Sequence, residues 1–348
     1  MIEAFAVMEA GGPVVPFQYT PLPLGSDQVE IAIDACGVCH SDLHQQCDDW
    51  GAANYPIVLG HEIIGRITAM GNNVHERYVG QRVGVGPQTG SCETCTECTS
   101  GREQLCAQRV KSYNSPTGDS RQPYTYGGFS KRIRVQAKWA FPIPENLDTK
   151  TAAPILCAGE TTWSPFVTHS IGKGSVVGVI GIGGLGHIAI QIAHARGCQT
   201  TAISTSPDKA DEARRLGADH FLNAKDPTEM ALGANTFDFL LSTISADGID
   251  WTPYLNLLRP GGVLCLVGLP GEVSFRPGAL VTKELSFTGS YLVPPSQIPV
   301  MLQFVADHGI QALIEDLPMT AENCNVALKR VADNAARYRM VLVNPERS

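Results

Sequence analysis

The sequence lacks several features that would assign it to a membrane, secreted or nucleic-acid-binding class. None of its apolar runs approaches the roughly 20 residues that a membrane-spanning helix needs. The opening segment, MIEAFAVMEAGG, has no basic stretch followed by an apolar one and so does not resemble a secretory signal. The net charge of −8 argues against nucleic acid, which requires a concentrated Lys/Arg surface. We therefore expect a cytoplasmic protein without a membrane or nucleic-acid partner.

Repeats, low-complexity tracts and runs of like charge are absent as well. The 348 residues exceed one ordinary core, and 43% hydrophobic with 17% charged residues is typical of a globular protein of about two domains. The eleven cysteines are not expected to form disulfides in a reducing cytoplasm. They are candidates for metal ligands, nucleophiles or small buried residues.

The pattern of the sequence changes near residue 150. Residues 1–150 contain short apolar alternations between turns, such as QVEIAIDACGV and GQRVGVG, which predict a β-rich, barrel-like domain. Residues 151–289 alternate β-branched runs with helical stretches, which is typical of βαβ units around a parallel sheet. The closing segment 290–348 contains a helix and a strand, and we expect it to return to the first domain. The predicted fold class is α/β.

One glycine-rich loop predicts a dinucleotide site. The segment GIGGLG follows the strand SVVGVI directly and precedes the helix HIAIQIAHA, which is the context this motif requires. Gly181 permits a tight turn, Gly183 lets the backbone approach a pyrophosphate, and Gly186 lets the helix pack on the strand. The backbone N–H groups at the helix N-terminus then face the phosphate. Gly184 and Leu185 complete the predicted loop.

The end of the next strand favours NADP(H) over NAD. An NAD site normally has Asp or Glu about 20 residues past the first glycine, where it binds the ribose 2′-hydroxyl. Here the strand TTAI leads into Ser204, Thr205 and Ser206, with Lys209 soon after and no carboxylate before Asp208. Hydroxyls and a cation suit a 2′-phosphate. The alternative is a plain turn with a solvated lysine.

A second motif predicts a metal centre. In CGVCHSDLH and the later GHE, Cys39 and His61 offer a thiolate and an imidazole, which suit zinc. Glu62, beside His61, is a further candidate ligand. Either residue alone would more often be structural, but their combination with a dinucleotide fold favours a functional site.

Four further cysteines lie within fifteen residues, in the segment SCETCTECTSGREQLC. They are separated by gaps of two, two and seven residues: Cys92, Cys95, Cys98 and Cys106. Four thiolates fill a tetrahedral zinc ion and leave no position for a substrate, so this set predicts a structural zinc. The remaining cysteines are expected to be small buried residues: Cys36, Cys47, Cys198, Cys265 and Cys324.

Together these motifs, with YPIVLGHEIIG and LCAGETT, resemble the zinc-dependent medium-chain alcohol dehydrogenases. Within that superfamily the chain most resembles the cinnamyl-alcohol-dehydrogenase-like branch, which includes bacterial NADPH-dependent aldehyde reductases. The resemblance runs along almost the whole chain, in order. It implies a GroES-like catalytic domain with an inserted Rossmann domain, two zinc ions per chain, NADP(H) and usually a homodimer.

The resemblance also implies roles that spacing does not supply. Cys157 corresponds to the third ligand of the catalytic zinc, Ser41 to the residue that contacts the substrate oxygen, and His44 to a proton relay. Thr161 corresponds to a nicotinamide contact, and Trp50 is a candidate wall of the substrate pocket, although a core position is nearly as plausible. Two more residues are assigned to the cofactor site: Gly268 and Ser290. The expected reaction is hydride transfer between NADP(H) and a primary alcohol or aldehyde, chiefly aldehyde reduction.

Two departures from the branch and three alternatives stay open. Glu160 stands where the branch has an apolar residue. The segment 113–128 is longer than in the branch, and it could form a surface loop, a lid or a dimer contact.

One alternative function is that of a zinc-stabilised adaptor or nucleic-acid module, against which the acidic balance counts. A second is a zinc-free quinone oxidoreductase or structural relative, against which the zinc ligands count. A third is an NAD-linked polyol or secondary-alcohol dehydrogenase, against which the missing carboxylate counts.

Overall fold

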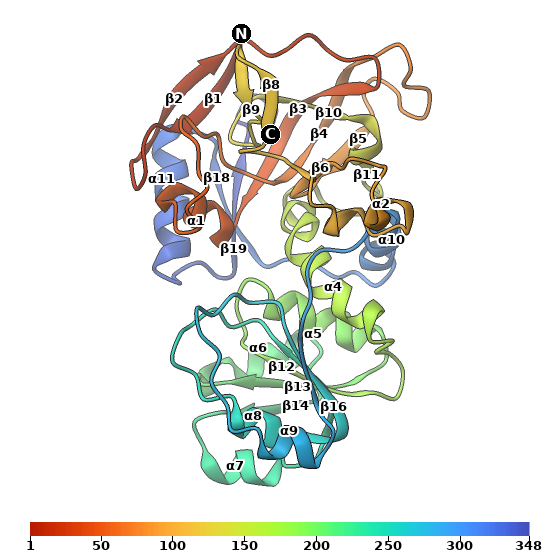
Figure 1. Cartoon of the computed structure of the whole chain (residues 1–348). Coiled ribbons are helices and arrows are strands. Elements are labelled where there is room, and N and C mark those ends of the chain that lie inside the picture. The colour runs from red at the N-terminus through yellow and green to blue at the C-terminus, as the bar shows by residue number, and fades with distance from the viewer. Residues whose placement is uncertain (348) are drawn as a thin grey trace. The chain divides into compact units, whose positions relative to one another are not determined.

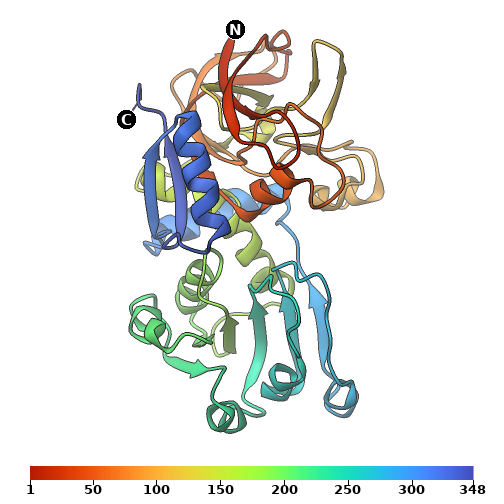
Figure 2. The same cartoon turned by 90° about the vertical axis from the view of Figure 1, so that its left-hand side faces the viewer.

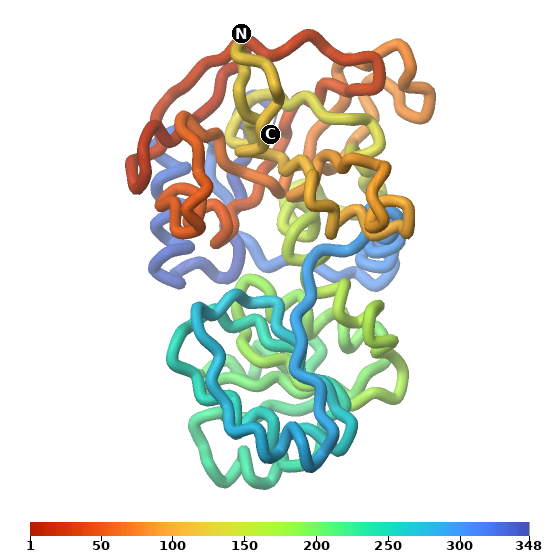
Figure 3. Tube along the Cα trace, in the orientation of Figure 1, coloured from red at the N-terminus to blue at the C-terminus, as the bar shows by residue number. Residues whose placement is uncertain are grey.

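The computed structural model describes residues 1–347, which form two compact units. The first unit contains Met1–Cys157, Val293–Ala306 and the C-terminal residues from Gln311; the second contains Ala158–Leu292 and Asp307–Ile310. Figure 3 traces this path, with the red-to-yellow and dark blue segments in the first unit. The C-terminal segment thus returns to the first unit.

The first boundary lies at 157/158, rather than at 150/151 as the sequence suggested. Two short helices follow residue 148, α3 (Thr149–Ala152) and the 3-10 helix η3 (Ala153–Leu156). Both contact strands β3 and β4 of the first unit, and this packing keeps them there. The second boundary lies at 292/293 instead of 289/290.

A seven-stranded sheet forms the frame of the first unit (Figure 1). Its order is β11-β5-β4-β3-β19-β18, with β10 also paired to β3. The strands are β3 (Gln28–Val38), β4 (Glu62–Met70), β5 (Arg82–Val85), β10 (Arg132–Gln136), β11 (Phe141–Pro142), β18 (Ile314–Pro318) and β19 (Arg339–Val343). Strand β19 lies antiparallel to β3, so the last strand of the chain belongs to the seven-stranded sheet of the first unit.

Smaller elements surround this sheet. Two-stranded sheets are formed by β1 (Ile2–Val7) with β2 (Val14–Tyr19), β6 (Gln88–Gly90) with β7 (Val110–Lys111), and β8 (Pro116–Asp119) with β9 (Gln122–Tyr124). The helices of this part are α1 (His40–Cys47), α2 (Thr96–Thr99), α10 (Ile298–Asp307) and α11 (Ala321–Ala332). Figure 2 shows α11 running along β18 and β19, which it contacts.

The core explains why these segments are strands. Every residue of β3 after Gln28 is buried, because the strand has neighbours on both edges and packed layers on its faces. Its β-branched side chains, among them Ile31 and Ile33, join one hydrophobic cluster with Phe129 and Leu342. A cluster that unites residues of β3 and β19 fixes the C-terminal strand in place.

The second unit contains a six-stranded parallel sheet in the order β14-β13-β12-β15-β16-β17. Its strands are β12 (Val176–Ile180), β13 (Gln199–Ser204), β14 (His220–Asn223), β15 (Phe237–Ser242), β16 (Leu258–Leu266) and β17 (Ser286–Gly289). Its helices are α4 (Ala158–Thr168), α5 (Gly186–Ala195), α6 (Ala210–Arg215), α7 (Pro227–Leu232), α8 (Thr252–Leu257) and α9 (Gly278–Thr282). Numbered within the unit, the strand order is 3-2-1-4-5-6, that of a Rossmann sheet.

Two structural observations concern membrane-spanning helices and the segment 113–128. Within the described residues, no helix is both long and apolar enough to cross a membrane. The segment 113–128 contains the β8–β9 hairpin, and its two end tyrosines, Tyr113 and Tyr126, are buried. The segment is therefore a surface hairpin whose base is fixed in the core.

Candidate metal centres and dinucleotide site

The sheet of the first unit brings Cys39 and His61 together. Cys39 follows the last residue of β3, and His61 precedes the first residue of β4. These strands are antiparallel neighbours with Gly37 opposite Glu62, so the two residues emerge at the same end of the ladder. Cys157 reaches the same place from η3, which packs against both strands.

The resulting cluster has the composition of a zinc site. One ligand atom from each of Cys39, His61, Glu62 and Cys157 lies within 4.8 Å of the others, and all four residues are buried. A hydrogen bond from the Cys157 thiol holds the pKa of Cys39 well below its ordinary value, and the same bond raises the pKa of Cys157. Two sulfur ligands and an imidazole form a donor set that binds zinc and keeps one position open for a substrate.

Asp42 organises the protein around this cluster. Its Oδ2 accepts a hydrogen bond from the Cys39 amide at 2.9 Å, and its Oδ1 accepts one from the Gly60 amide at 2.9 Å. Oδ1 also lies 3.3 Å from Nδ1 of His61. Burial lowers the pKa of His61, but the Asp42 carboxylate and the Cys39 sulfur together outweigh burial and raise that pKa well above its ordinary value. With Nδ1 engaged, Nε2 is the nitrogen available to a metal.

Glu62 and Arg339 form a buried ion pair beside the cluster. Arg339 is the first residue of β19, and its guanidinium donates to Oε1 of Glu62. Burial raises the pKa of Glu62 to about 7, although the positive charge of Arg339 opposes that shift. Among the described residues, Oε2 of Glu62 is buried without a hydrogen-bond partner. An unpaired carboxylate oxygen at this point fits a cation bound among the cysteines.

The predicted relay residues follow Cys39 along α1. The Ser41 hydroxyl oxygen lies 3.8 Å from the Cys39 sulfur. His44 is three residues further along the same helix face, and its Nδ1 lies 2.8 Å from Oδ2 of Asp49. The Trp50 ring packs on the His44 ring at 4.9 Å and is 44% exposed, which excludes the core position that the sequence left open.

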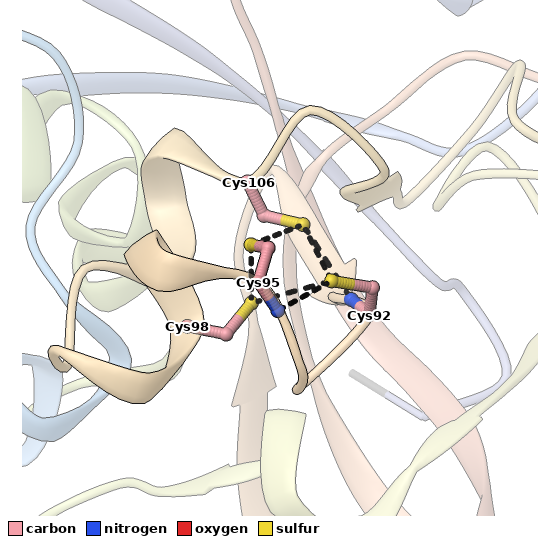
Figure 4. A group of neighbouring side chains, drawn as sticks. All are labelled: Cys92, Cys95, Cys98 and Cys106. Carbon is pink, nitrogen blue, oxygen red and sulfur yellow. Dashed lines mark hydrogen bonds between the residues drawn. The ribbon is translucent and has the colours of Figure 1, made fainter.

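The four-cysteine segment folds around a single point, as Figure 4 shows. The sulfur-to-sulfur distance is 3.5 Å for Cys95–Cys98 and for Cys92–Cys106. It is 3.8 Å for Cys92–Cys98 and for Cys95–Cys106. A tetrahedral zinc with Zn–S bonds of about 2.3 Å places its sulfurs about 3.8 Å apart. A disulfide would need about 2.05 Å, so the cysteines are not paired. Backbone N–H groups of Thr94 and Cys95 lower the pKa of Cys92 to about 6, which favours a thiolate.

The dinucleotide loop of the second unit has the geometry that its glycines predict. Gly181 has a φ of 93°, and Gly186 approaches so closely that a Cβ would lie 1.9 Å from the Gly181 carbonyl oxygen. A Cβ on Gly183 would meet nothing within 4 Å. Leu185 occupies the N-cap position of α5, whose first residue is Gly186. The loop therefore combines a tight turn, a close helix–strand contact and an open backbone face.

The residues predicted to choose the cofactor lie beside this loop. Ser204 ends β13, the neighbour of β12, and its hydroxyl accepts a hydrogen bond from the Ser206 amide at 3.1 Å. The Lys209 ammonium donates to the carbonyl of Ile182, inside the glycine loop, at 2.7 Å. Thr205, between the two serines, is exposed. A cation and hydroxyls thus gather at the carboxyl edge of the sheet.

The other predicted cofactor residues lie in the same unit. Gly268 follows β16, and a Cβ there would lie 2.1 Å from the carbonyl oxygen of Ile244. The Ser290 hydroxyl, just after β17, bonds to that of Ser164 in α4 at 3.0 Å. Thr161 and the buried Glu160 belong to the first turns of α4, and Gly184 lies in the loop before α5.

One prediction for the remaining cysteines was wrong. Cys36, Cys198, Cys265 and Cys324 are buried as expected, but Cys47 is exposed. Cys47 is the last residue of α1, and its side chain at this helix end is exposed to solvent instead of packing in the core.

The sequence did not assign three residues that the structure places at the first metal centre. They are Asp42, Tyr113 and Arg339, all of which contact His61 or Glu62. Asp42 lies inside the motif CGVCHSDLH, so proximity to Cys39 was an available signal. Tyr113 and Arg339 come from distant segments, and the sequence held no signal that linked them to the site.

Comparisons with known proteins agree with this arrangement. Residues 25–145 match the alcohol dehydrogenase GroES-like domain, and residues 184–307 match the zinc-binding dehydrogenase family. The chain is 38% identical to aldehyde reductase AdhA of Synechocystis over 345 residues, 98% of each protein. It also resembles the structure of a cinnamyl alcohol dehydrogenase from Sorghum bicolor (37% identity, TM-score 0.93, 98% of this chain and 97% of that one). The structure of CAD from Helicobacter pylori, complexed with NADP(H), is 29% identical with a TM-score of 0.90 over 98% and 97% of the chains.

Proposed function

Because the chain belongs to the zinc-dependent medium-chain alcohol dehydrogenases, in their cinnamyl-alcohol-dehydrogenase-like branch, we propose that it reduces aldehydes to primary alcohols with NADPH. The observation that carries the proposal is the buried cluster of two cysteines and one histidine, with a separate four-cysteine site in the same unit. The first has the open donor set of a catalytic zinc, and the second has the closed set of a structural zinc.

The chemistry divides between the bound groups and the protein. A zinc ion held by Cys39, His61 and Cys157 would supply a Lewis acid for the substrate oxygen, and NADPH would supply the hydride. Ser41 donates a proton to the oxygen of the forming alcohol. His44 then returns a proton to Ser41, and Asp49, bonded to Nδ1, holds the imidazole in orientation.

The choice of NADPH rests on the edge of β13. Ser204, Thr205 and Ser206 offer hydroxyls, and the Lys209 ammonium is already held at the glycine loop through Ile182. A 2′-phosphate would gain charge-assisted hydrogen bonds there, whereas no carboxylate ends the strand to bind the two ribose hydroxyls of NAD. The NADP(H) bound by the Helicobacter pylori relative is consistent with this choice.

Two measurements test the proposal. Elemental analysis of the purified protein should give two zinc ions per chain. A content of one ion or none would contradict the assignment of two zinc sites. Turnover should be followed with a panel of aliphatic and aromatic aldehydes, each with NADPH and with NADH. We expect reduction with a marked preference for NADPH. Turnover of polyols with NAD alone would favour the alternative dehydrogenase.

A further inference from the structure

Tyr113 reaches the catalytic cluster from the segment that follows the four-cysteine site. Its hydroxyl lies 3.2 Å from Nδ1 of His61, and the two ring centroids are 5.7 Å apart. The side chain is only 5% exposed. A buried hydroxyl on the far nitrogen of a predicted metal ligand acts on that ligand rather than on solvent.

The hydroxyl is one of two side-chain partners of the His61 Nδ1 atom. A neutral imidazole that offers Nε2 to a metal carries its proton on Nδ1. That N–H faces two acceptors, the Tyr113 oxygen at 3.2 Å and Oδ1 of Asp42 at 3.3 Å. Tyr113 and Asp42 therefore both lie on the same ring nitrogen of His61.

Tyr113 is held firmly in this position by its neighbours. The amide of Ser112 donates to the carbonyl of Pro87 at 3.0 Å, which ties the segment to the residue just before β6. Asn114 has a φ of 62°. Its side-chain amide donates to Oε1 of Gln45 in α1 at 2.7 Å and to the carbonyl oxygen of Ala52 at 2.9 Å. Asn tolerates this left-handed backbone better than most residues.

We propose that Tyr113 is a positioning residue of the catalytic metal site, which fixes the orientation and tautomer of His61 together with Asp42 and so strengthens zinc binding. This inference rests on the proposed function. Partners on the outer nitrogen of a metal-binding histidine change metal affinity by about 10–100-fold. Asp42 remains in place when the hydroxyl is removed, so the lower part of that range is expected.

The test is Tyr113→Phe, which removes the hydroxyl and keeps the ring. Zinc release to a chromogenic chelator is followed in the holoenzyme, and a Cys157→Ala variant identifies which phase belongs to the catalytic site. Competition with chelators of graded affinity then gives the dissociation constant of that site. The matched control is Tyr126→Phe, because Tyr126 is 7% exposed in the same unit and packs on Tyr19 and Phe17 instead.

We expect Tyr113→Phe to weaken zinc at the catalytic site about tenfold, with the four-cysteine zinc and the Tyr126→Phe protein unchanged. Equal affinity in Tyr113→Phe and the wild type would overturn the inference while leaving the proposed function intact. So would equal weakening of both zinc sites, since that would indicate general loosening. A wild-type protein that holds only the four-cysteine zinc would instead refute the proposed function.

Discussion

Replacing Lys209 by alanine should change the choice of cofactor more than the rate. The ammonium donates to the Ile182 carbonyl at 2.7 Å and is therefore already placed at the dinucleotide loop. Losing a hydrogen bond from a charged group costs about 1.5–3 kcal/mol, or roughly tenfold to a hundredfold in affinity. Removal of the Ile182 contact also disturbs the loop itself, but the loop serves both cofactors. The ratio of the two Michaelis constants isolates the 2′-phosphate contribution from that shared loss.

The assay is initial-rate aldehyde reduction at varied NADPH and at varied NADH, with wild type and Lys209→Ala. We expect the Michaelis constant for NADPH to rise about tenfold or more relative to that for NADH. Lys225→Ala is the matched control, because Lys225 is an exposed lysine in the same unit that follows β14. An equal rise for NADPH and NADH would refute the argument, because it would mean that Lys209 supports the loop without contacting the phosphate. Salt should weaken the preference in the wild type and not in the variant.

Three further substitutions separate the roles of the two metal centres. Cys39→Ala should abolish turnover and lower the zinc content to one ion per chain, whereas retained turnover would mean that Cys39 is not a ligand. His44→Ala should keep both zinc ions, a normal melting temperature and a turnover number about 10²-fold lower; wild-type rates at every pH would exclude the relay. Cys95→Ser should lower the melting temperature and release only the four-cysteine zinc, since its binding energy contributes to local folding. Part of the activity should survive below the new melting temperature, and complete loss with the catalytic zinc still bound would assign the four cysteines to the chemistry.

The parts of the site that local sequence predicts are those built from consecutive residues. The four cysteines lie within fifteen positions, and a loop so short can bring all of its sulfurs together. The glycine loop is equally local, because a strand, a turn and a helix follow one another without interruption. The fold class follows from the same kind of pattern, since alternating strand and helix periods specify a parallel sheet. In each case the sequence neighbours are also the spatial neighbours.

The remaining ligands depend on the sheet. Cys39 and His61 meet only because β3 and β4 pair with Gly37 opposite Glu62, a register that the two motifs do not state. Cys157 was assigned through resemblance alone, since its position depends on how η3 packs against those strands. The return of the C-terminal segment was expected, but its consequence was not. It delivers Arg339 to Glu62 across 277 residues of sequence.

Tyr113 shows most clearly why such partners escape a reading of the sequence. It lies 52 residues from His61, in a segment whose length was the only feature that drew attention. A tyrosine in a turn is ordinary, and nothing in its flanking residues indicates a metal ligand. Its role depends on a chain of placements: β7 pairs with β6, Ser112 bonds to Pro87, and Asn114 binds α1. These contacts join the strands on either side of the four-cysteine loop to α1, the helix that follows Cys39. The placement of Tyr113 therefore depends on pairings between segments far apart in the sequence, none of which its own flanking residues predict.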